Sequence, residues 1–119
     1  MGGFNLEISE LAKGIYQALD DKKAEEISVI DISSLSDIAD YFVIATVNNT
    51  NQMDAACDAV DEYMTKQGIT AKNIEGHVRD RSNWILMDYT DIIVHVFDRE
   101  ARDFYNLEHI WKDGKSVTF

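Results

Sequence analysis

The sequence contains no proline, a single cysteine and few basic residues, and each shortage excludes something. Cys57 alone cannot form a disulfide within the chain, which indicates a reducing compartment. No apolar run approaches the roughly 20 residues that a helix needs to cross a bilayer. Residues 1–4 lack the basic and apolar regions of a signal peptide, so we expect a cytoplasmic protein.

Basic residues number 11 against 22 acidic ones, which gives a formal net charge of −11. This balance argues against binding to nucleic acid through phosphates, because such binding needs clustered Lys and Arg. It is compatible with a basic protein partner, since complementary charge steers association. The acid excess is uneven, with a net charge of −9 in residues 1–70 and −2 in residues 71–119.

The length of 119 residues and the hydrophobic content of 45% are typical of one globular domain. We expect this domain to span 1–119, with a core of about 6–112 and a tail at 113–119. Hydrophobic periodicity predicts three helices, at 6–21, 51–67 and 98–110. Runs rich in β-branched and apolar residues predict strands, at 26–32, 41–47 and 73–75 and in a hairpin over 84–97.

The element order predicts an α/β fold, a single-domain mixed sheet of four to five strands with packed helices. Strand 41–47 is apolar without alternation, so we expect it to be central and covered on both faces. Gly68 follows the second helix as a stop signal. The third helix is predicted to begin at a capping Asp98. Its inward residues would be Ala101, Phe104, Tyr105 and Ile110.

The hairpin is the most informative segment. If Tyr89 and Thr90 form a two-residue loop, then Asp88 pairs with Asp91, Leu86 with Ile93 and Trp84 with His95. One face is then apolar and belongs to the core, namely Ile85, Met87, Ile92, Val94 and Val96. The other face mixes aromatic, carboxylate and aliphatic groups and resembles a recognition surface, namely Trp84, Leu86, Asp88, Asp91, Ile93, His95 and Phe97.

Catalytic and metal-binding patterns are missing from the sequence. Cys57, His77, His95 and His109 lack the spacing of a zinc site, and we expect structural or solvent roles for them. There is no nucleophile elbow and no glycine-rich phosphate loop. Metal-dependent nucleotidyl transfer needs two acids on one side of a strand, yet no Asp-x-Asp occurs. We therefore expect no enzyme, no cofactor and no metal.

The sequence resembles the ribosomal silencing factor family, also called Iojap-like proteins, over residues 6–112. The resemblance is carried by WILMDYTDIIVHVF at 84–97, EARDFYNLEHIW at 100–111 and DIADYFVIAT at 37–46, with Gln52 and Glu75-Gly76 in the same order. The chain departs from the family's usual Gly at Val47 and Thr90, from its usual Ser and Arg at Asn49 and Asn51, and from a frequent Pro at Arg99.

The resemblance implies a nucleotidyltransferase-like fold without the catalytic acids. It implies binding to the large ribosomal subunit through its fourteenth ribosomal protein, on the face that meets the small subunit. A factor docked there blocks subunit joining and represses translation under nutrient limitation. Carried over by position, the family's contact residues are Trp84, Leu86, Asp88, Tyr89, Asp91, His95, Tyr105, Glu108 and Trp111.

Two other readings stay open at this point. A divergent metal-dependent nucleotidyltransferase would use Asp88, Asp91 or Asp98 and would bind nucleotide with Mg²⁺. An adaptor would use the same mixed face for another basic protein. The family also contains self-associating members, and the sequence leaves a monomer and a homodimer equally open.

Overall fold

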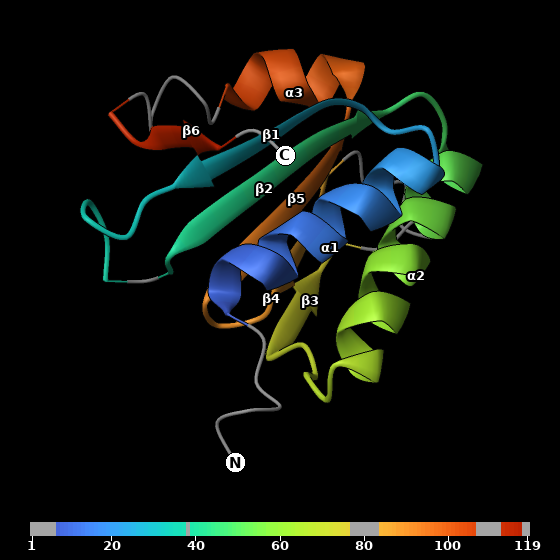
Figure 1. The fold of residues 1–119 in the computed structure, drawn as a ribbon. Helices are drawn as coiled ribbons and strands as arrows, with labels where there is room; N and C mark the ends of the chain where they lie inside the picture. The colour runs from blue at the N-terminus through green and yellow to red at the C-terminus, as the bar shows by residue number, and fades with distance from the viewer. Residues whose placement is uncertain (1–6, 38, 77–83, 107–112, 118–119) are drawn as a thin grey trace.

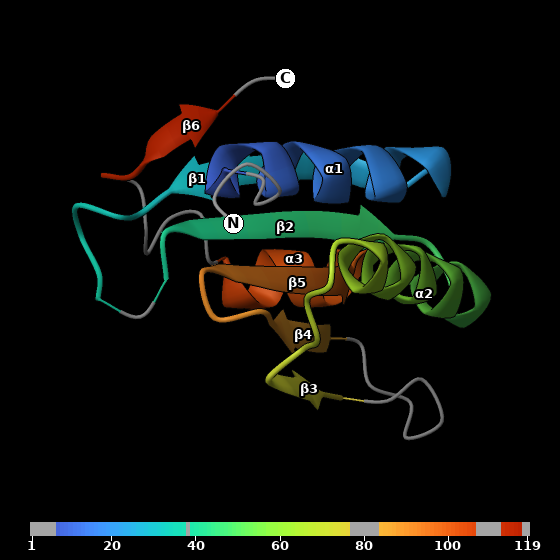
Figure 2. The ribbon, with the colours of Figure 1, turned by 60° about the horizontal axis from the view of Figure 1, so that its bottom comes forward.

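A computed structural model describes residues 7–37, 39–76, 84–106 and 113–117, and shows a mixed sheet between two layers of helices (Figures 1 and 2). The helices are α1 (Ile8–Asp21), α2 (Thr50–Lys66) and α3 (Arg99–Tyr105). The strands are β1 (Glu25–Asp31), β2 (Tyr41–Val47), β3 (Asn73–Glu75), β4 (Trp84–Asp88), β5 (Ile92–Asp98) and β6 (Lys115–Val117). Helices α1 and α2 cover one face of the sheet, and α3 lies on the other (Figure 2).

The strand order is β3-β4-β5-β2-β1-β6, in one six-stranded sheet. β2 pairs parallel with β5 and antiparallel with β1, and it is buried along almost its whole length. The prediction of a central strand covered on both faces is therefore confirmed. The α/β class is also confirmed, but the count of four to five strands was one too low, because the chain after Gly114 forms β6 against β1.

The first two helices lie within two residues of their predicted bounds, and local signals explain their ends. The Asn49 side chain accepts the backbone N–H of Gln52 at 2.7 Å and caps α2. Gly68 follows α2 with φ +79, the left-handed conformation that suits glycine after a helix. The Gln52 amide donates to the carbonyls of Lys22 and Lys23, so it ties the start of α2 to the segment after α1.

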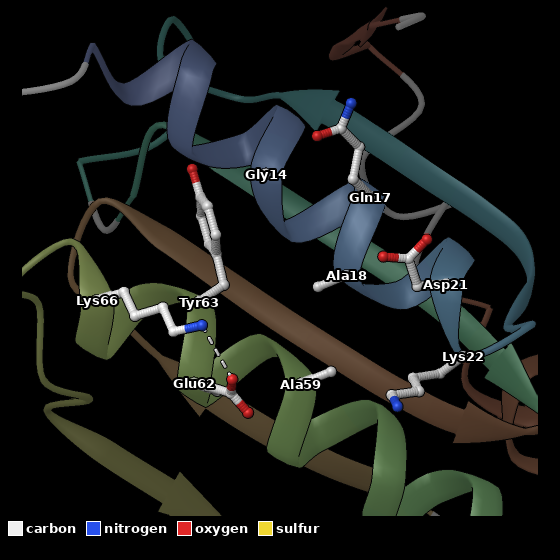
Figure 3. Close-up of a pocket in the computed structure, with 9 residues that line it drawn as sticks. All are labelled: Gly14, Gln17, Ala18, Asp21, Lys22, Ala59, Glu62, Tyr63 and Lys66. Atoms are coloured by element: carbon white, nitrogen blue, oxygen red, sulfur yellow. Dashed lines mark ion pairs between the residues drawn. The ribbon is translucent and has the colours of Figure 1, made fainter.

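The contact between α1 and α2 depends on a missing side chain. A Cβ placed on Gly14 would overlap the ring of Tyr63, which lies across α1 at this point (Figure 3). Glycine is therefore required here by the close approach of the Tyr63 ring rather than by backbone conformation. Among the described residues, no helix is both long and apolar enough to cross a membrane.

Two apolar clusters form the core, one on each face of the sheet. The larger cluster lies under α1 and α2, and it includes Cys57 and the predicted apolar face of the hairpin. The smaller cluster lies on the α3 side, and Trp84 and Leu86 pack against its edge. At this edge of the sheet Trp84 and Leu86 stay half-buried.

Candidate functional site

The hairpin forms, but in a register two residues away from the predicted one. Trp84 lies opposite Phe97 and Leu86 lies opposite His95. The predicted pairing of Trp84 with His95 is therefore wrong. Because side chains alternate with a period of two, a shift of two residues keeps nearly every side chain on its predicted face.

The turn explains the shift. The Tyr89 N–H donates to the Ile92 carbonyl at 2.9 Å, so the two-residue loop is Thr90-Asp91 rather than Tyr89-Thr90. Thr90 adopts φ +75, and its N–H donates to the Asp88 carboxylate at 2.8 Å. The expected pairing of Asp88 with Asp91 is wrong, and Tyr89 joins the apolar face instead.

The burial of one face of the hairpin agrees with the prediction, and the burial of the other differs from it. The apolar face is buried throughout, as predicted. On the mixed face, Trp84, Leu86 and Asp88 of β4 are half-buried. Their β5 neighbours Ile93, His95 and Phe97 are buried, because β5 is a central strand covered by the second core cluster and α3. The surface that a partner could reach is therefore narrower than the sequence indicated.

An aromatic cluster occupies this face. The Trp84 ring lies 5.4 Å from Phe97, 4.7 Å from Tyr105 and 5.8 Å from His95, measured between ring centroids. The Phe97 and Tyr105 rings are 5.8 Å apart, so Tyr105 of α3 closes over the two strands. These distances are in the range where aromatic pairs attract beyond simple burial. The cluster therefore gives Trp84 a firm backing while one side of it remains accessible.

His95 interacts with the indole of Trp84. The Trp84 Nε1–H donates to His95 Nδ1 at 3.1 Å. Since an indole nitrogen only donates, Nδ1 must be unprotonated, and the neutral ring carries its proton on Nε2. Burial lowers the pKa of His95 from 6.5 to about 4, because a charged imidazolium would lose its water. His95 is thus neutral at physiological pH.

The structure places the predicted contact residues in three settings. Asp91 and Tyr105 are exposed, and Trp84, Leu86 and Asp88 are half-buried. Tyr89 and His95 are buried, with 4% exposure each. Glu108 and Trp111 lie outside the described residues. Five of the predicted contact residues are therefore at least partly accessible to a partner. We call them the aromatic patch, namely Trp84, Leu86, Asp88, Asp91 and Tyr105.

Tyr89 faces away from the aromatic patch, on the α2 side of the sheet. Its hydroxyl donates to the Asp61 carboxylate of α2 at 2.8 Å. Burial and this hydrogen bond raise the pKa of Tyr89. The arrangement fixes the hairpin against α2, so the buried Tyr89 has a structural role in the fold.

The third helix is shorter than predicted. Asp98 caps it by accepting the Ala101 N–H at 2.8 Å, as expected. It ends at Tyr105 because Asn106 takes a left-handed conformation, with φ +45. The inward placement of Phe104 is wrong, since Phe104 is 80% exposed, whereas Ala101 is buried as predicted. The predicted continuation through Ile110 lies outside the described residues.

Sequence reasoning missed the importance of Arg102. This buried side chain of α3 donates to the Glu26 carbonyl at 2.7 Å, to Thr46 Oγ1 at 2.9 Å and to Ser28 Oγ at 3.3 Å. These bonds join α3 to β1 and β2. Glu26 lies where the register of β1 shifts, and its φ is +49. The sequence did not single out Arg102, because most charged residues on helix faces are exposed to solvent.

Several departures from the family pattern have visible structural roles. Thr90 occupies a left-handed position where glycine would be less strained. Asn49 caps α2 through its side chain. Arg99 forms ion pairs with Glu25 at 2.7 Å and Glu26 at 3.0 Å, which a proline could not. None of the three lies in the aromatic patch.

The described residues offer little for catalysis. Asp88 and Asp98, named above as candidate catalytic acids, both accept backbone N–H groups, one in the turn and one at a helix cap. No three His, Cys, Asp or Glu side chains of the described part gather as a metal site. Burial, with Asp58 and Asp54 nearby, raises the pKa of the Cys57 thiol to about 12, so it is a poor nucleophile.

A hollow also lies between α1 and α2. Figure 3 shows Ala18 and Ala59 on its floor, with Gln17 and Asp21 along the α1 side. Its Glu62 is engaged by Lys66 at 3.1 Å across one turn of α2. The hollow lies on the helix layer, away from the sheet face that carries the aromatic patch (Figures 2 and 3).

Comparison with known proteins gives consistent results. Residues 5–119 match the family described as "Ribosomal silencing factor during starvation". The chain is 37% identical over 113 residues to ribosomal silencing factor RsfS of Halalkalibacterium halodurans, covering 95% of this chain and 92% of that protein. It is 40% identical over 97 residues to the protein of that name from Bacillus subtilis, covering 82% and 80%.

A solved structure supports the fold. A crystal structure of a protein from Chromobacterium violaceum superposes with a TM-score of 0.85 at 31% identity, and the match covers 96% of this chain and 92% of that one. The α/β sheet and its helices are therefore shared with an experimentally determined structure.

Proposed function

The chain belongs to the ribosomal silencing factor family, and from that premise we propose that it docks on the large ribosomal subunit and prevents the small subunit from joining. In this proposal the partner is the fourteenth protein of the large subunit, and the result is repression of translation in the cytoplasm under nutrient limitation. The role is regulatory and needs no catalytic step.

The aromatic patch is the observation that carries this proposal. Half-buried tryptophan and exposed tyrosine beside carboxylates are the composition of protein-interaction anchors. Trp84 is backed by Phe97 and Tyr105, so a partner meets an ordered surface. Asp88 and Asp91 lie at the turn of the same hairpin and can face basic groups of a partner.

The distribution of charge fits a ribosomal protein better than ribosomal RNA. The net charge of −11 is repelled by phosphates, whereas a basic protein is attracted. The aromatic patch itself contains Asp88 and Asp91 and no basic residue, so the contact surface is acidic as well. The acids of α1 and α2 then disfavour non-specific contact with neighbouring RNA.

Steric exclusion is a sufficient mechanism. The molecule extends 41 × 31 × 24 Å, so a copy docked where the two subunits touch is too thick for them to close over it. A domain anchored by the aromatic patch at such a point of contact therefore keeps the two subunits apart. Affinity and rigidity are the properties that this mechanism requires.

Sedimentation tests the proposal. We expect the protein to move with purified large subunits through a sucrose gradient and to stay at the top with small subunits. A protein that stays at the top with both would contradict the proposal. Trp84→Ala is the variant that removes the central side chain of the aromatic patch. Lys66→Ala is its control, because Lys66 is exposed on α2, which covers the opposite face of the sheet.

A further inference from the structure

We propose that His95 is a positioning residue, which fixes the indole of Trp84 for the partner and does not itself touch the partner. The inference rests on the proposed function, since it assigns roles within the same surface. It replaces the expectation that His95 is a contact residue.

Burial excludes direct contact. His95 lies in β5 between Leu86 of β4 and Ile44 of β2, and only 4% of it is exposed. Phe42 meets its ring at a centroid distance of 5.0 Å and an angle of 68°. A partner can therefore reach His95 only through the indole of Trp84, whose N–H donates to Nδ1.

A buried histidine at this position lowers the stability of the fold, which indicates a role other than stabilisation. Among the described residues, its buried Nε2 has no hydrogen-bond partner, although the tautomer derived above places a proton there. A buried donor that has lost water and gained no acceptor destabilises the fold. An aliphatic residue such as Leu would fill the same space without this penalty. What Leu could not supply is the acceptor at Nδ1.

The Nδ1 acceptor fixes the orientation of the Trp84 indole, which ring stacking alone would leave free. The rings of Phe97 and Tyr105 stack against Trp84, and stacked rings tolerate sliding and rotation. A hydrogen bond from Nε1 to Nδ1 at 3.1 Å restricts the indole to one orientation. A side chain that is already ordered loses less entropy on binding, which increases affinity.

The first experiment observes the indole without any partner. In ¹⁵N-labelled protein the Trp84 Nε1–H signal is assigned by its loss in Trp84→Phe. We expect slow hydrogen exchange of this signal in the wild type and in His95→Asn, because Asn Oδ1 occupies the place of Nδ1. Exchange should become much faster in His95→Leu. Equal exchange in Leu and Asn variants would overturn the proposal.

The second experiment measures affinity for purified large subunits together with stability. His95→Leu should bind about 3- to 10-fold more weakly than wild type, the effect of one hydrogen bond, and His95→Asn should bind close to wild type. Stability should follow the opposite order, since Leu fills the space and removes the orphaned donor while Asn leaves a cavity. Binding that simply follows stability would contradict a positioning role.

A double-mutant cycle completes the test. Trp84→Phe keeps a ring but removes the indole N–H, so adding His95→Leu to it should weaken binding to large subunits little further. Additive losses would refute the coupling. If the wild type fails to bind large subunits while the exchange results hold, the proposed function fails and the positioning of Trp84 stands.

Discussion

Replacing Arg102 by methionine tests whether α3 is held on the sheet by the Arg102 hydrogen bonds. Methionine keeps an apolar stem of similar length and removes the guanidinium. The bonds to the Glu26 carbonyl and Thr46 Oγ1, at 2.7 and 2.9 Å, are short, whereas the bond to Ser28 at 3.3 Å is long. At about 1.5 kcal/mol for each short bond, the expected loss in the free energy of unfolding is about 3 kcal/mol.

The loss is large enough for a thermal assay. For a chain of 119 residues, the entropy of unfolding is about 0.25 kcal/mol per kelvin, so Tm should fall by about 12 °C. Differential scanning calorimetry measures it directly. The matched control is Arg99→Met on the same helix, where the ion pairs with Glu25 and Glu26 are solvent-exposed and Tm should hardly change. A Tm for Arg102→Met within about 3 °C of wild type would refute the reasoning.

Three further predictions concern the hairpin. Trp84→Ala should weaken binding to large subunits by about 2 kcal/mol, measured by sedimentation, and unchanged affinity would move the interface elsewhere. Tyr89→Phe should lower stability by about 1 kcal/mol in urea unfolding and leave ribosome binding intact, because it removes only the bond to Asp61. The lowered pKa of His95, about 4 against 6.5, makes the wild type lose up to about 3 kcal/mol as pH falls from 6.5 to 4, since only the unfolded chain is protonated there. His95→Leu should lack this loss.

The hairpin shows what sequence patterns predict well and what they do not. Alternation over 84–97 predicted the core face correctly, because burial of Ile85, Met87 and their neighbours decides which face turns inward. It did not predict the turn. A register two residues away preserves the same alternation, and the choice depends on Thr90 accepting φ +75 and on the bond from Tyr89 to Ile92.

The sequence predicted which residues form the recognition surface, but it did not predict how deeply some of them are buried. Trp84 and Asp88 remain reachable, but His95 is buried because β5 became a central strand. That depends on the parallel pairing of β2 with β5, a contact between segments about 50 residues apart that no local pattern specifies. The role of Arg102 was hidden for the same reason, since its acceptors belong to β1 and β2.

The ends of elements were the least predictable. The third helix stops at Tyr105 because Asn106 turns left-handed, although the apolar spacing continues to Ile110. β6 was taken as part of a tail, because three residues after Gly114 carry no periodicity of their own. It is a strand only because the edge of β1 offers unpaired backbone groups.

A subunit-joining assay measures directly whether the protein keeps the two ribosomal subunits apart. Purified large and small subunits are mixed at a Mg²⁺ concentration that favours joining, with and without a molar excess of the protein, and are separated on a sucrose gradient. If the protein excludes the small subunit, the peak of joined ribosomes should fall, free subunits should rise, and the protein should move with the large subunit. An undiminished peak of joined ribosomes, with the protein bound to the large subunit, would contradict this exclusion.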